Sequence, residues 1–157
     1  QLIELVNQSE NISLDIYGPV KDTAYWQSCQ PAMEASQGRV QYKGAIEPER
    51  VQDTFCNYDA SVLLTRGENF GHALYESLSV GRPVITSYFT PWNELEKKKA
   101  GWNLDIANDE ACLQELASVC NMDTDVFAGY CKGAHQTALS YFAGSSALDH
   151  YHTMFTK

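Results

Sequence analysis

The chain has 157 residues, a length typical of one domain, and hydrophobic residues make up 44% of it. Its formal net charge of −9 argues against a nucleic-acid-binding surface, which needs a basic face. Five cysteines, an odd number with no C-x-x-C pair, fit poorly with a disulfide framework and favour reduced thiols in a cytoplasmic protein. We therefore expect one globular domain that captures any anionic ligand locally and not through its overall charge.

Apolar runs and helical patterns alternate along the chain. The first residues, "QLIELVNQSE", read as an amphipathic helix entered partway, which suggests a piece of a longer protein. Strands are predicted at residues 13–18, 39–44, 60–65, 83–87 and 101–106. The first of these strands is predicted to be buried. Helices are predicted at residues 22–36, 47–58, 71–80, 108–120, 123–142 and 146–155. Pro31 is expected to break or kink the first of these helices.

Strands that alternate with helices imply a parallel sheet covered on both faces. With right-handed crossovers, the predicted fold is a single α/β domain over residues 1–157, built on a doubly wound parallel sheet flanked by helices. Ligands of such sheets bind at the carboxyl ends of the strands. The turn at residues 65–71 follows a predicted strand and precedes a helix, so it is the candidate site.

Two glycines and two acids mark this turn. Gly67 and Gly71 allow the backbone to approach a ligand, and the free N–H groups of the following helix suit a phosphate. Glu68 and Glu76 flank the start of that helix, and a carboxylate can accept hydrogen bonds from two hydroxyls. By residue type and position alone, plainer interpretations are favoured: Glu76 as a solvated helix residue and Glu68 as a favourable charge near a helix start. A nucleotide sugar would use all these groups, the amides for its diphosphate and the acids for its hydroxyls.

The stretch "ENFGHALYESLSVGRPVITS" resembles the E-x7-E signature of retaining glycosyltransferases of the group 1 family, which have two Rossmann-like domains in the GT-B architecture. Glu68 and Glu76 match the two glutamates of that signature. The stretches "SLDIYG", "VQYKGAI" and "YDASVLLT" resemble the strands that precede it in the family, and "TPW" resembles a variant common among bacterial members. The resemblance covers residues 12–106 and implies the C-terminal, donor-binding half of a GT-B fold.

The resemblance also implies a role for each matching residue at the turn. Glu68 would be the catalytic glutamate that contacts the hydroxyls of the donor sugar. Glu76 would bind the ribose hydroxyls of the nucleotide. The backbone amides of Phe70, Gly71 and His72 would meet the sugar and the diphosphate.

The base of the nucleotide would lie against Ala45 and Ile46, in the loop after the second strand. By analogy with the family, the transfer would retain the anomeric configuration and would need neither a metal nor a cofactor, the nucleotide-diphosphate sugar being the substrate. Fixed dipoles and cations would stabilise the leaving group.

The family also grips the diphosphate with an arginine and a lysine, one helix upstream of the strand that matches "SLDIYG". That position falls before Gln1, as does the domain that would bind a glycan or lipid-linked acceptor. Arg66 and Lys43 lie near the proposed site but match no position of the family. We expect a cytoplasmic hexosyltransferase of polysaccharide biosynthesis, which could be peripheral to the membrane, and an isolated piece that is inactive.

Two other functions remain open from the sequence. A non-catalytic module that binds a nucleotide sugar or a glycan for regulation would have less need of Glu68. A GT-B-type nucleotide-sugar epimerase would need its own acid and base, which the sequence does not reveal. No metal site is predicted, because His150 and His152 lack a third ligand at a suitable spacing.

Overall fold

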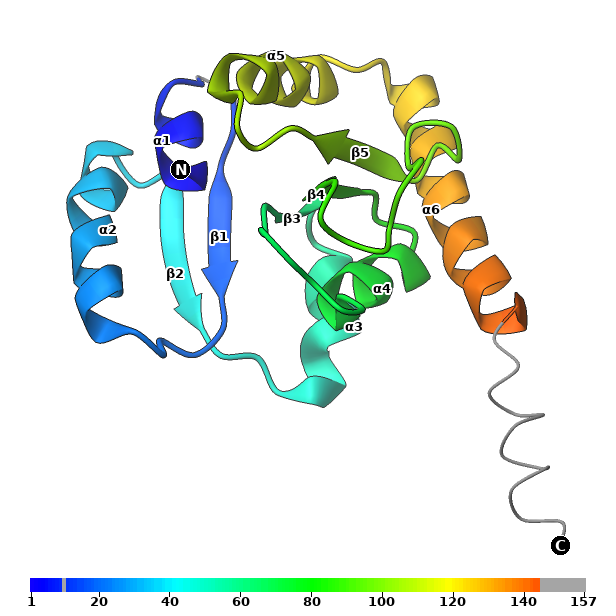
Figure 1. Ribbon diagram of the computed structural model, residues 1–157, viewed down its shortest axis with the longest axis horizontal. Coiled ribbons are helices and arrows are strands. Elements are labelled where there is room, and N and C mark those ends of the chain that lie inside the picture. The colour runs from blue at the N-terminus through cyan, green and yellow to red at the C-terminus, as the bar shows by residue number, and fades with distance from the viewer. Residues whose placement is uncertain (10, 145–157) are drawn as a thin grey trace, which may run out of the picture.

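The computed structural model describes residues 1–9 and 11–144 of the chain. Parallel strands form the middle layer, and helices cover it on both faces (Figure 1). The helices are α1 (Leu2–Asn7), α2 (Thr23–Ala35), a short 3-10 turn (Pro48–Arg50), α3 (Val51–Phe55), α4 (His72–Ser79), α5 (Asp109–Cys120) and α6 (Thr124–Gly144). The strands are β1 (Leu14–Tyr17), β2 (Val40–Gly44), β3 (Ser61–Leu63), β4 (Val84–Ser87) and β5 (Gly101–Leu104).

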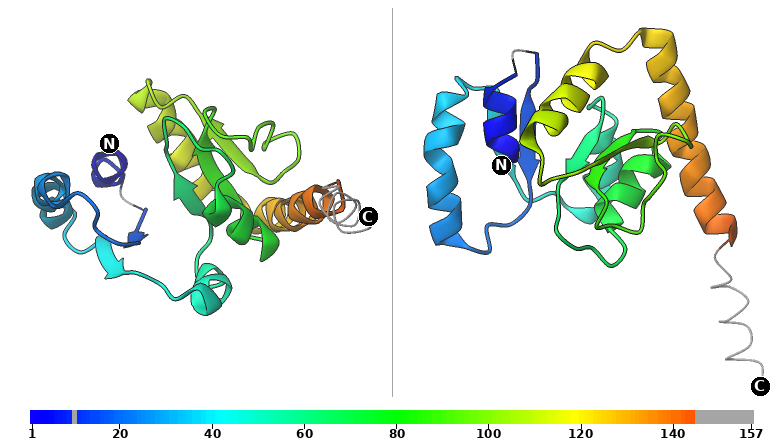
Figure 2. Two further views of the ribbon diagram at one scale, coloured as in Figure 1. Left: turned by 60° about the horizontal axis from the view of Figure 1, so that its bottom comes forward. Right: turned by 45° about the horizontal axis from the view of Figure 1, so that its top comes forward.

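Within the described part of the chain, the strands form two sheets and not one. β1 pairs with β2, and β4 lies between β3 and β5; every pair is parallel. Figure 2 (left) shows the β1–β2 pair standing apart from the three-stranded sheet. The predicted α/β fold with parallel strands and flanking helices is confirmed, but the predicted continuous sheet is interrupted between β1 and β3.

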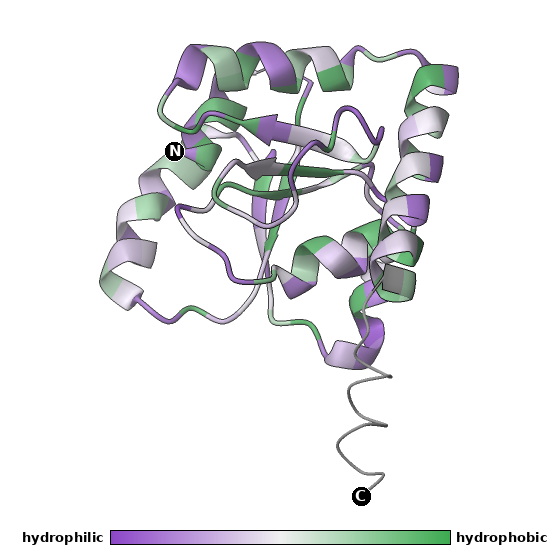
Figure 3. Ribbon diagram, turned by 45° about the vertical axis from the view of Figure 1, so that its right-hand side comes forward, coloured by the Kyte–Doolittle hydropathy of each residue, from purple (hydrophilic) through white to green (hydrophobic). Residues whose placement is uncertain are grey.

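Apolar side chains form a core layer on each face of the three-stranded sheet. One layer joins the sheet to α4 and α6, and its buried members include Leu74, Leu78, Val84, Leu95, Ala134 and Ala138. The other joins it to α1 and α5, and its buried members are Leu5, Ile85, Trp102, Leu104, Cys112 and Leu116. Figure 3 shows hydrophilic and hydrophobic stretches alternating along α5 and α6, as expected for helices with one face on a sheet.

Side-chain caps explain where two helices begin. The Asn108 side chain accepts a hydrogen bond from the Ala111 amide at 3.0 Å, and two acidic residues follow in the first turn of α5. The Asp22 side chain caps α2 in the same way, accepting from the Tyr25 amide at 2.9 Å. Such caps supply acceptors for amides that have no partner inside the helix. The predicted start of the helix at residue 108 is thereby confirmed.

Several predicted elements differ from the structure. The predicted helix at 47–58 is a 3-10 turn followed by a single turn of α-helix, and the predicted strand at 60–65 is only three residues long. α2 continues through Pro31, because losing one internal hydrogen bond does not end a helix of 13 residues. The predicted buried strand, β1, is only half-buried. The predicted helix at 146–155 lies outside the described residues.

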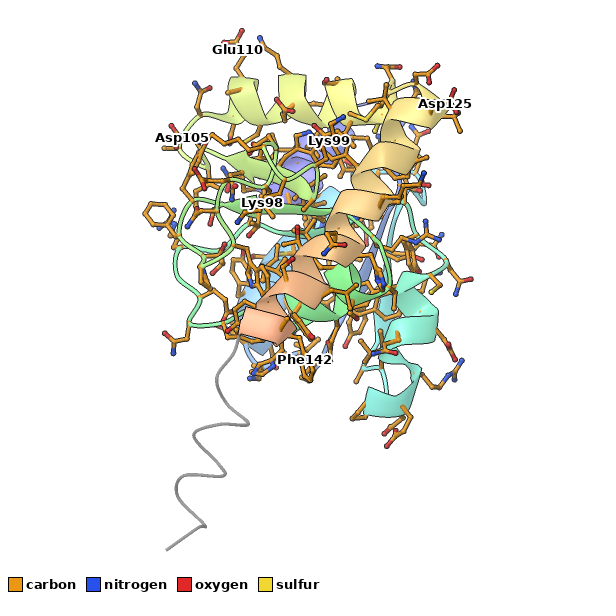
Figure 4. The ribbon with its side chains drawn as sticks, turned by 90° about the vertical axis from the view of Figure 1, so that its right-hand side faces the viewer. Lys98, Lys99, Asp105, Glu110, Asp125 and Phe142 are labelled. Carbon is orange, nitrogen blue, oxygen red and sulfur yellow. The ribbon has the colours of Figure 1, made fainter. Side chains whose placement is uncertain are left out.

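The turn that carries Lys98 and Lys99 packs against α6 (Figure 4). A side chain at Gly133 of α6 would collide with the carbonyl oxygens of both lysines, so only glycine permits this contact. The lysine side chains are exposed, as the charged run in the sequence indicates. Among the described helices, none is long and apolar enough to cross a membrane.

Candidate functional site

The candidate loop, residues 65–71, leaves the carboxyl end of β3 and enters α4. The Thr65 hydroxyl donates to the Gly67 carbonyl at 2.9 Å and accepts from the Gly67 amide at 3.2 Å, which closes the first turn of the loop. Gly71 then adopts φ +77° and ψ +64°, the left-handed conformation that glycine tolerates best. This conformation turns the chain directly into α4.

The start of α4 offers a row of unpaired donors. No acceptor within the described residues bonds to the amides of Phe70, Gly71, His72, Ala73 or Leu74, and the first amide with a helical partner is that of Tyr75, bonded to the Gly71 carbonyl at 3.0 Å. Among the described residues, no side chain caps this helix. Consecutive free amides at a helix N-terminus carry partial positive charge and bind anions.

Glu68 and Glu76 lie on either side of this row. Glu68 is exposed, its amide donates to the Phe89 carbonyl at 3.1 Å, and its carboxylate accepts from the Asn69 amide at 3.0 Å. Glu76 lies one turn into α4 and is half-buried. Neither acid takes part in a salt bridge with any described residue. Both carboxylates therefore retain acceptor capacity for a ligand.

The loop that follows β4 holds the candidate loop in place. It supplies the Phe89 carbonyl to Glu68, and the Trp92 indole N–H donates to the Phe70 carbonyl at 2.5 Å. Phe70 also packs on Trp92, with ring centroids 5.6 Å apart, and on Tyr141 of α6, at 5.3 Å. This anchoring was not predicted from the sequence.

His72 lies beside the same aromatic group. Its exposed ring meets Phe70 edge to face, with centroids 4.8 Å apart. Because its backbone amide is the first of α4 and its side chain is exposed, either could reach a ligand at this end of the helix.

Ala45 and Ile46 lie apart from the other candidate residues. They follow the carboxyl end of β2, which belongs to the two-stranded sheet, while Glu68 to Glu76 follow β3. A hollow of about 180 Å³ opens at the carboxyl end of β1, and aromatic side chains of Tyr17, Trp26 and Tyr42 contribute to its lining. The candidate residues therefore fall into two groups. Both groups follow the carboxyl ends of parallel strands, but the strands belong to different sheets.

A polar cluster that joins β1 and β2 to the turn after α3 was missed by sequence reasoning. The Tyr58 hydroxyl donates to Asp15 at 2.7 Å and lies 2.6 Å from the Tyr17 hydroxyl, and the Lys43 ammonium lies 3.6 Å from the same Asp15 carboxylate. Burial, followed by the hydrogen bond to Asp15, raises the pKa of Tyr58 well above its ordinary value near 10. Lys43 is therefore engaged by Asp15, whereas Arg66 is exposed and forms no salt bridge with a described residue.

Metal ligands do not gather anywhere in the described part of the chain, where no group of three or more His, Cys, Asp or Glu side chains could hold an ion. The pair His150 and His152 lies outside the described residues.

Solved structures similar to this one share its fold at low sequence identity. Sucrose-phosphate synthase from Thermosynechococcus elongatus superimposes with a TM-score of 0.82 at 16% identity, covering 99% of this chain and 41% of its own. HepE from Anabaena, solved in complex with UDP, superimposes with a TM-score of 0.76 at 19% identity, over 87% of this chain and 39% of its own. The C-terminal domain of the group 1 glycosyltransferase LpcC from Francisella tularensis superimposes with a TM-score of 0.73 at 12% identity, over 89% of this chain and 74% of its own.

These matches identify the fold as the α/β, Rossmann-like half of a GT-B glycosyltransferase. The chain spans between 29% and 39% of the first three solved structures that it matches. No match to a curated protein sequence is found. The sequence model of the group 1 glycosyl transferases matches residues 1–121, most of the chain, and the chain therefore belongs to the glycosyl transferases group 1 family.

Proposed function

We propose that this chain binds the nucleotide-diphosphate-sugar donor of a retaining glycosyltransferase. The observation that carries the proposal is the row of five amides, residues 70–74, that lies in the sequence between Glu68 and Glu76: no described residue accepts from these amides or forms a salt bridge with either acid. Amides at a helix start suit the diphosphate, and carboxylates suit neutral hydroxyls. HepE, which shares the fold, was solved with UDP, so a nucleoside diphosphate is the natural first ligand to test.

The roles follow from the E-x7-E signature that the sequence resembles. Glu68 orients the hydroxyls of the donor sugar, and Glu76 binds those of the ribose. The amides of Phe70, Gly71 and His72 hold the sugar and the diphosphate. These amides also stabilise the charge that develops on the leaving diphosphate, since donors that are already in position need no reorganisation during the reaction.

The base lies against Ala45 and Ile46 in this proposal. The nearest aromatic surface is the pair Trp26 and Tyr42, which pack on each other with ring centroids 4.7 Å apart and line the hollow at the end of β1, a hollow that neither Ala45 nor Ile46 lines. Flat aromatic surfaces stack on nucleobases of any identity.

The complete reaction needs parts outside this chain. In this proposal a hexosyl group is transferred with retention of its anomeric configuration and without a metal. A preceding domain binds the glycan or lipid-linked acceptor, and a basic loop upstream of Gln1 supplies cations to the diphosphate. We place the protein in the cytoplasm, in polysaccharide biosynthesis. We propose that the chain by itself binds the donor weakly and turns nothing over.

A titration with UDP tests the proposal. In an amide-resolved NMR spectrum of the chain, millimolar UDP is expected to shift or broaden the signals of residues 65–76. Amides of α5, which packs on the other face of the sheet from α4, serve as the internal control. Unchanged signals at 65–76 would rule out this site, and equal changes along α5 would indicate non-specific binding.

A further inference from the structure

Asn103 is a polar side chain that faces an apolar layer. It lies in β5 and is only 5% exposed, and its neighbours Trp102 and Leu104 belong to the core layer beneath α5. Because side chains alternate along a strand, Asn103 faces the other layer, which contains Trp92 and Leu95. A buried amide costs free energy unless its polar atoms are hydrogen-bonded. The partners of Asn103 therefore indicate its role.

Both polar atoms of the Asn103 side chain bind the backbone of one turn, residues 92–99, which connects β4 to β5. The side-chain N–H donates to the Trp92 carbonyl at 2.8 Å, and the side-chain oxygen accepts from the Leu95 amide at 3.2 Å. The turn also bonds back to the strand, since the Glu96 carboxylate accepts from the Asn103 amide at 2.8 Å. Asn103 thus holds the 92–99 turn to β5.

The 92–99 turn contains strained backbone. Glu94 and Lys99 adopt φ +59° and +50°, in the left-handed region that residues other than glycine rarely occupy. Such conformations persist only where the surrounding structure fixes them. On its other side the turn packs on α6 at Gly133, where the carbonyls of Lys98 and Lys99 leave no room for a Cβ. Asn103 and α6 together therefore hold the turn in one conformation.

This conformation sets the position of the Trp92 indole. The Trp92 amide donates to the Thr90 hydroxyl at 3.3 Å, and the Trp92 carbonyl accepts from Asn103. With its backbone held at both groups, Trp92 extends its indole N–H to the Phe70 carbonyl in the candidate loop. A chain of hydrogen bonds therefore runs from β5, through Trp92, to the residue that precedes Gly71.

The bond to the Phe70 carbonyl acts on the next amide of the chain. The Phe70 carbonyl and the Gly71 N–H belong to one rigid peptide plane, which is trans, so they point in opposite directions. A bond that fixes the carbonyl therefore also fixes the direction of the Gly71 N–H, which no described residue accepts. The same bond polarises the peptide group and makes this N–H a stronger donor.

We propose that Asn103 is a positioning residue of the candidate site, which acts through the 92–99 turn and Trp92 to direct the Gly71 amide toward the diphosphate. It lies on β5, two strands away from β3, whose carboxyl end leads into the candidate loop. The role toward the diphosphate rests on the proposed function. The role toward the loop does not, because the chain of hydrogen bonds requires no nucleotide.

Two substitutions separate positioning from stability. Asn103→Leu keeps the branched shape of the side chain, adds no charge, and removes both hydrogen bonds to the 92–99 turn. Leu116→Ala, which removes core contacts of α5 on the other face of the sheet, is the control for lost stability alone. Both variants are compared with the wild type at a temperature at which thermal unfolding curves show each protein to be folded.

The NMR signals of the Trp92 indole N–H and the Gly71 amide report on the loop without nucleotide. In Asn103→Leu both signals are expected to shift, and the Trp92 indole proton should exchange with solvent roughly threefold to tenfold faster. The Trp26 indole, on α2, is the internal reference. UDP should bind Asn103→Leu roughly threefold to tenfold more weakly than the wild type, the factor that one hydrogen bond contributes. Leu116→Ala should leave both signals and the UDP affinity unchanged.

Glu96→Ala provides a second test if Asn103→Leu does not fold. Glu96 is exposed, and its loss removes the acceptor of the Asn103 amide. This variant also loses a negative charge, which by itself would favour an anion, so weaker UDP binding would come from the turn and not from the charge. The Trp92 and Gly71 signals should shift in the same direction as in Asn103→Leu.

Unchanged Trp92 and Gly71 signals in the folded variants would overturn the positioning role, and so would equal changes in Leu116→Ala. Altered signals with an unchanged UDP affinity would overturn the role of Asn103 toward the diphosphate. A wild-type protein that does not bind UDP would refute the proposed function, while the two signals would still decide whether Asn103 positions the loop.

Discussion

Substituting Gly71 by alanine tests how the candidate loop is built. An L-residue in the left-handed conformation at φ +77° costs about 1–2 kcal/mol. The new Cβ would also lie 3.0 Å from Leu74 Cδ1, which can rotate away, and 3.2 Å from Glu68 Cγ, which would have to shift. We therefore expect Gly71→Ala to lower the free energy of unfolding by about 1–2 kcal/mol and to displace the Glu68 carboxylate.

Gly67→Ala is the matched control, because nothing lies within 4 Å of a Cβ at Gly67 and its φ is not positive. Thermal unfolding should place the midpoint of Gly71→Ala roughly 2–8 °C below that of the wild type, and that of Gly67→Ala close to it. Calorimetry or NMR titration with UDP should show weaker binding by Gly71→Ala only. Equal stability and equal UDP affinity of the two variants would refute the idea that the left-handed turn shapes the site.

Three further predictions concern the candidate site and the polar cluster around Tyr58. In an active glycosyltransferase that contains this chain, Glu68→Gln should mainly reduce turnover and Glu76→Gln should mainly weaken donor binding. Steady-state kinetics showing the reverse would exchange their roles. Trp92→Phe removes the hydrogen bond to the Phe70 carbonyl. It should lower the free energy of unfolding, measured by chemical denaturation, by about 1–2 kcal/mol and also weaken UDP binding. Unchanged UDP affinity would show that this bond does not position the loop. Folding raises the pKa of Tyr58, so the unfolded chain loses the hydroxyl proton first as the pH rises. The contribution of the Tyr58 hydroxyl to the free energy of unfolding is therefore full below pH 10 and falls as the pH rises above it. Denaturation curves of Tyr58→Phe should lack this fall, and the same dependence of stability on pH in both proteins would refute the assignment.

The sequence predicted the elements whose causes are local. The cap at Asn108 and the apolar run of β4 are encoded within a few neighbouring residues, and both appear in the structure as expected. The turn from β3 to α4 was likewise predicted at Gly71, because its composition and spacing are specific. The positions of Glu68 and Glu76 around this turn follow from it.

Features that depend on distant partners could not be predicted in this way. β1 was expected to be buried, but burial of a central strand depends on both neighbouring strands, and only β2 pairs with it here. The Trp92 bond to the Phe70 carbonyl joins residues 22 positions apart, and the Tyr58 bond to Asp15 joins residues 43 apart. No periodic pattern records such pairings, so they emerge only from the folded structure.

A crystal structure of the protein with bound UDP tests the central claim most directly. We expect phosphate oxygens about 2.7–3.2 Å from amide nitrogens at the start of α4, chiefly those of Gly71 and His72, with the ribose hydroxyls on Glu76. A diphosphate bound elsewhere, with these amides still unpaired or occupied only by solvent, would contradict it.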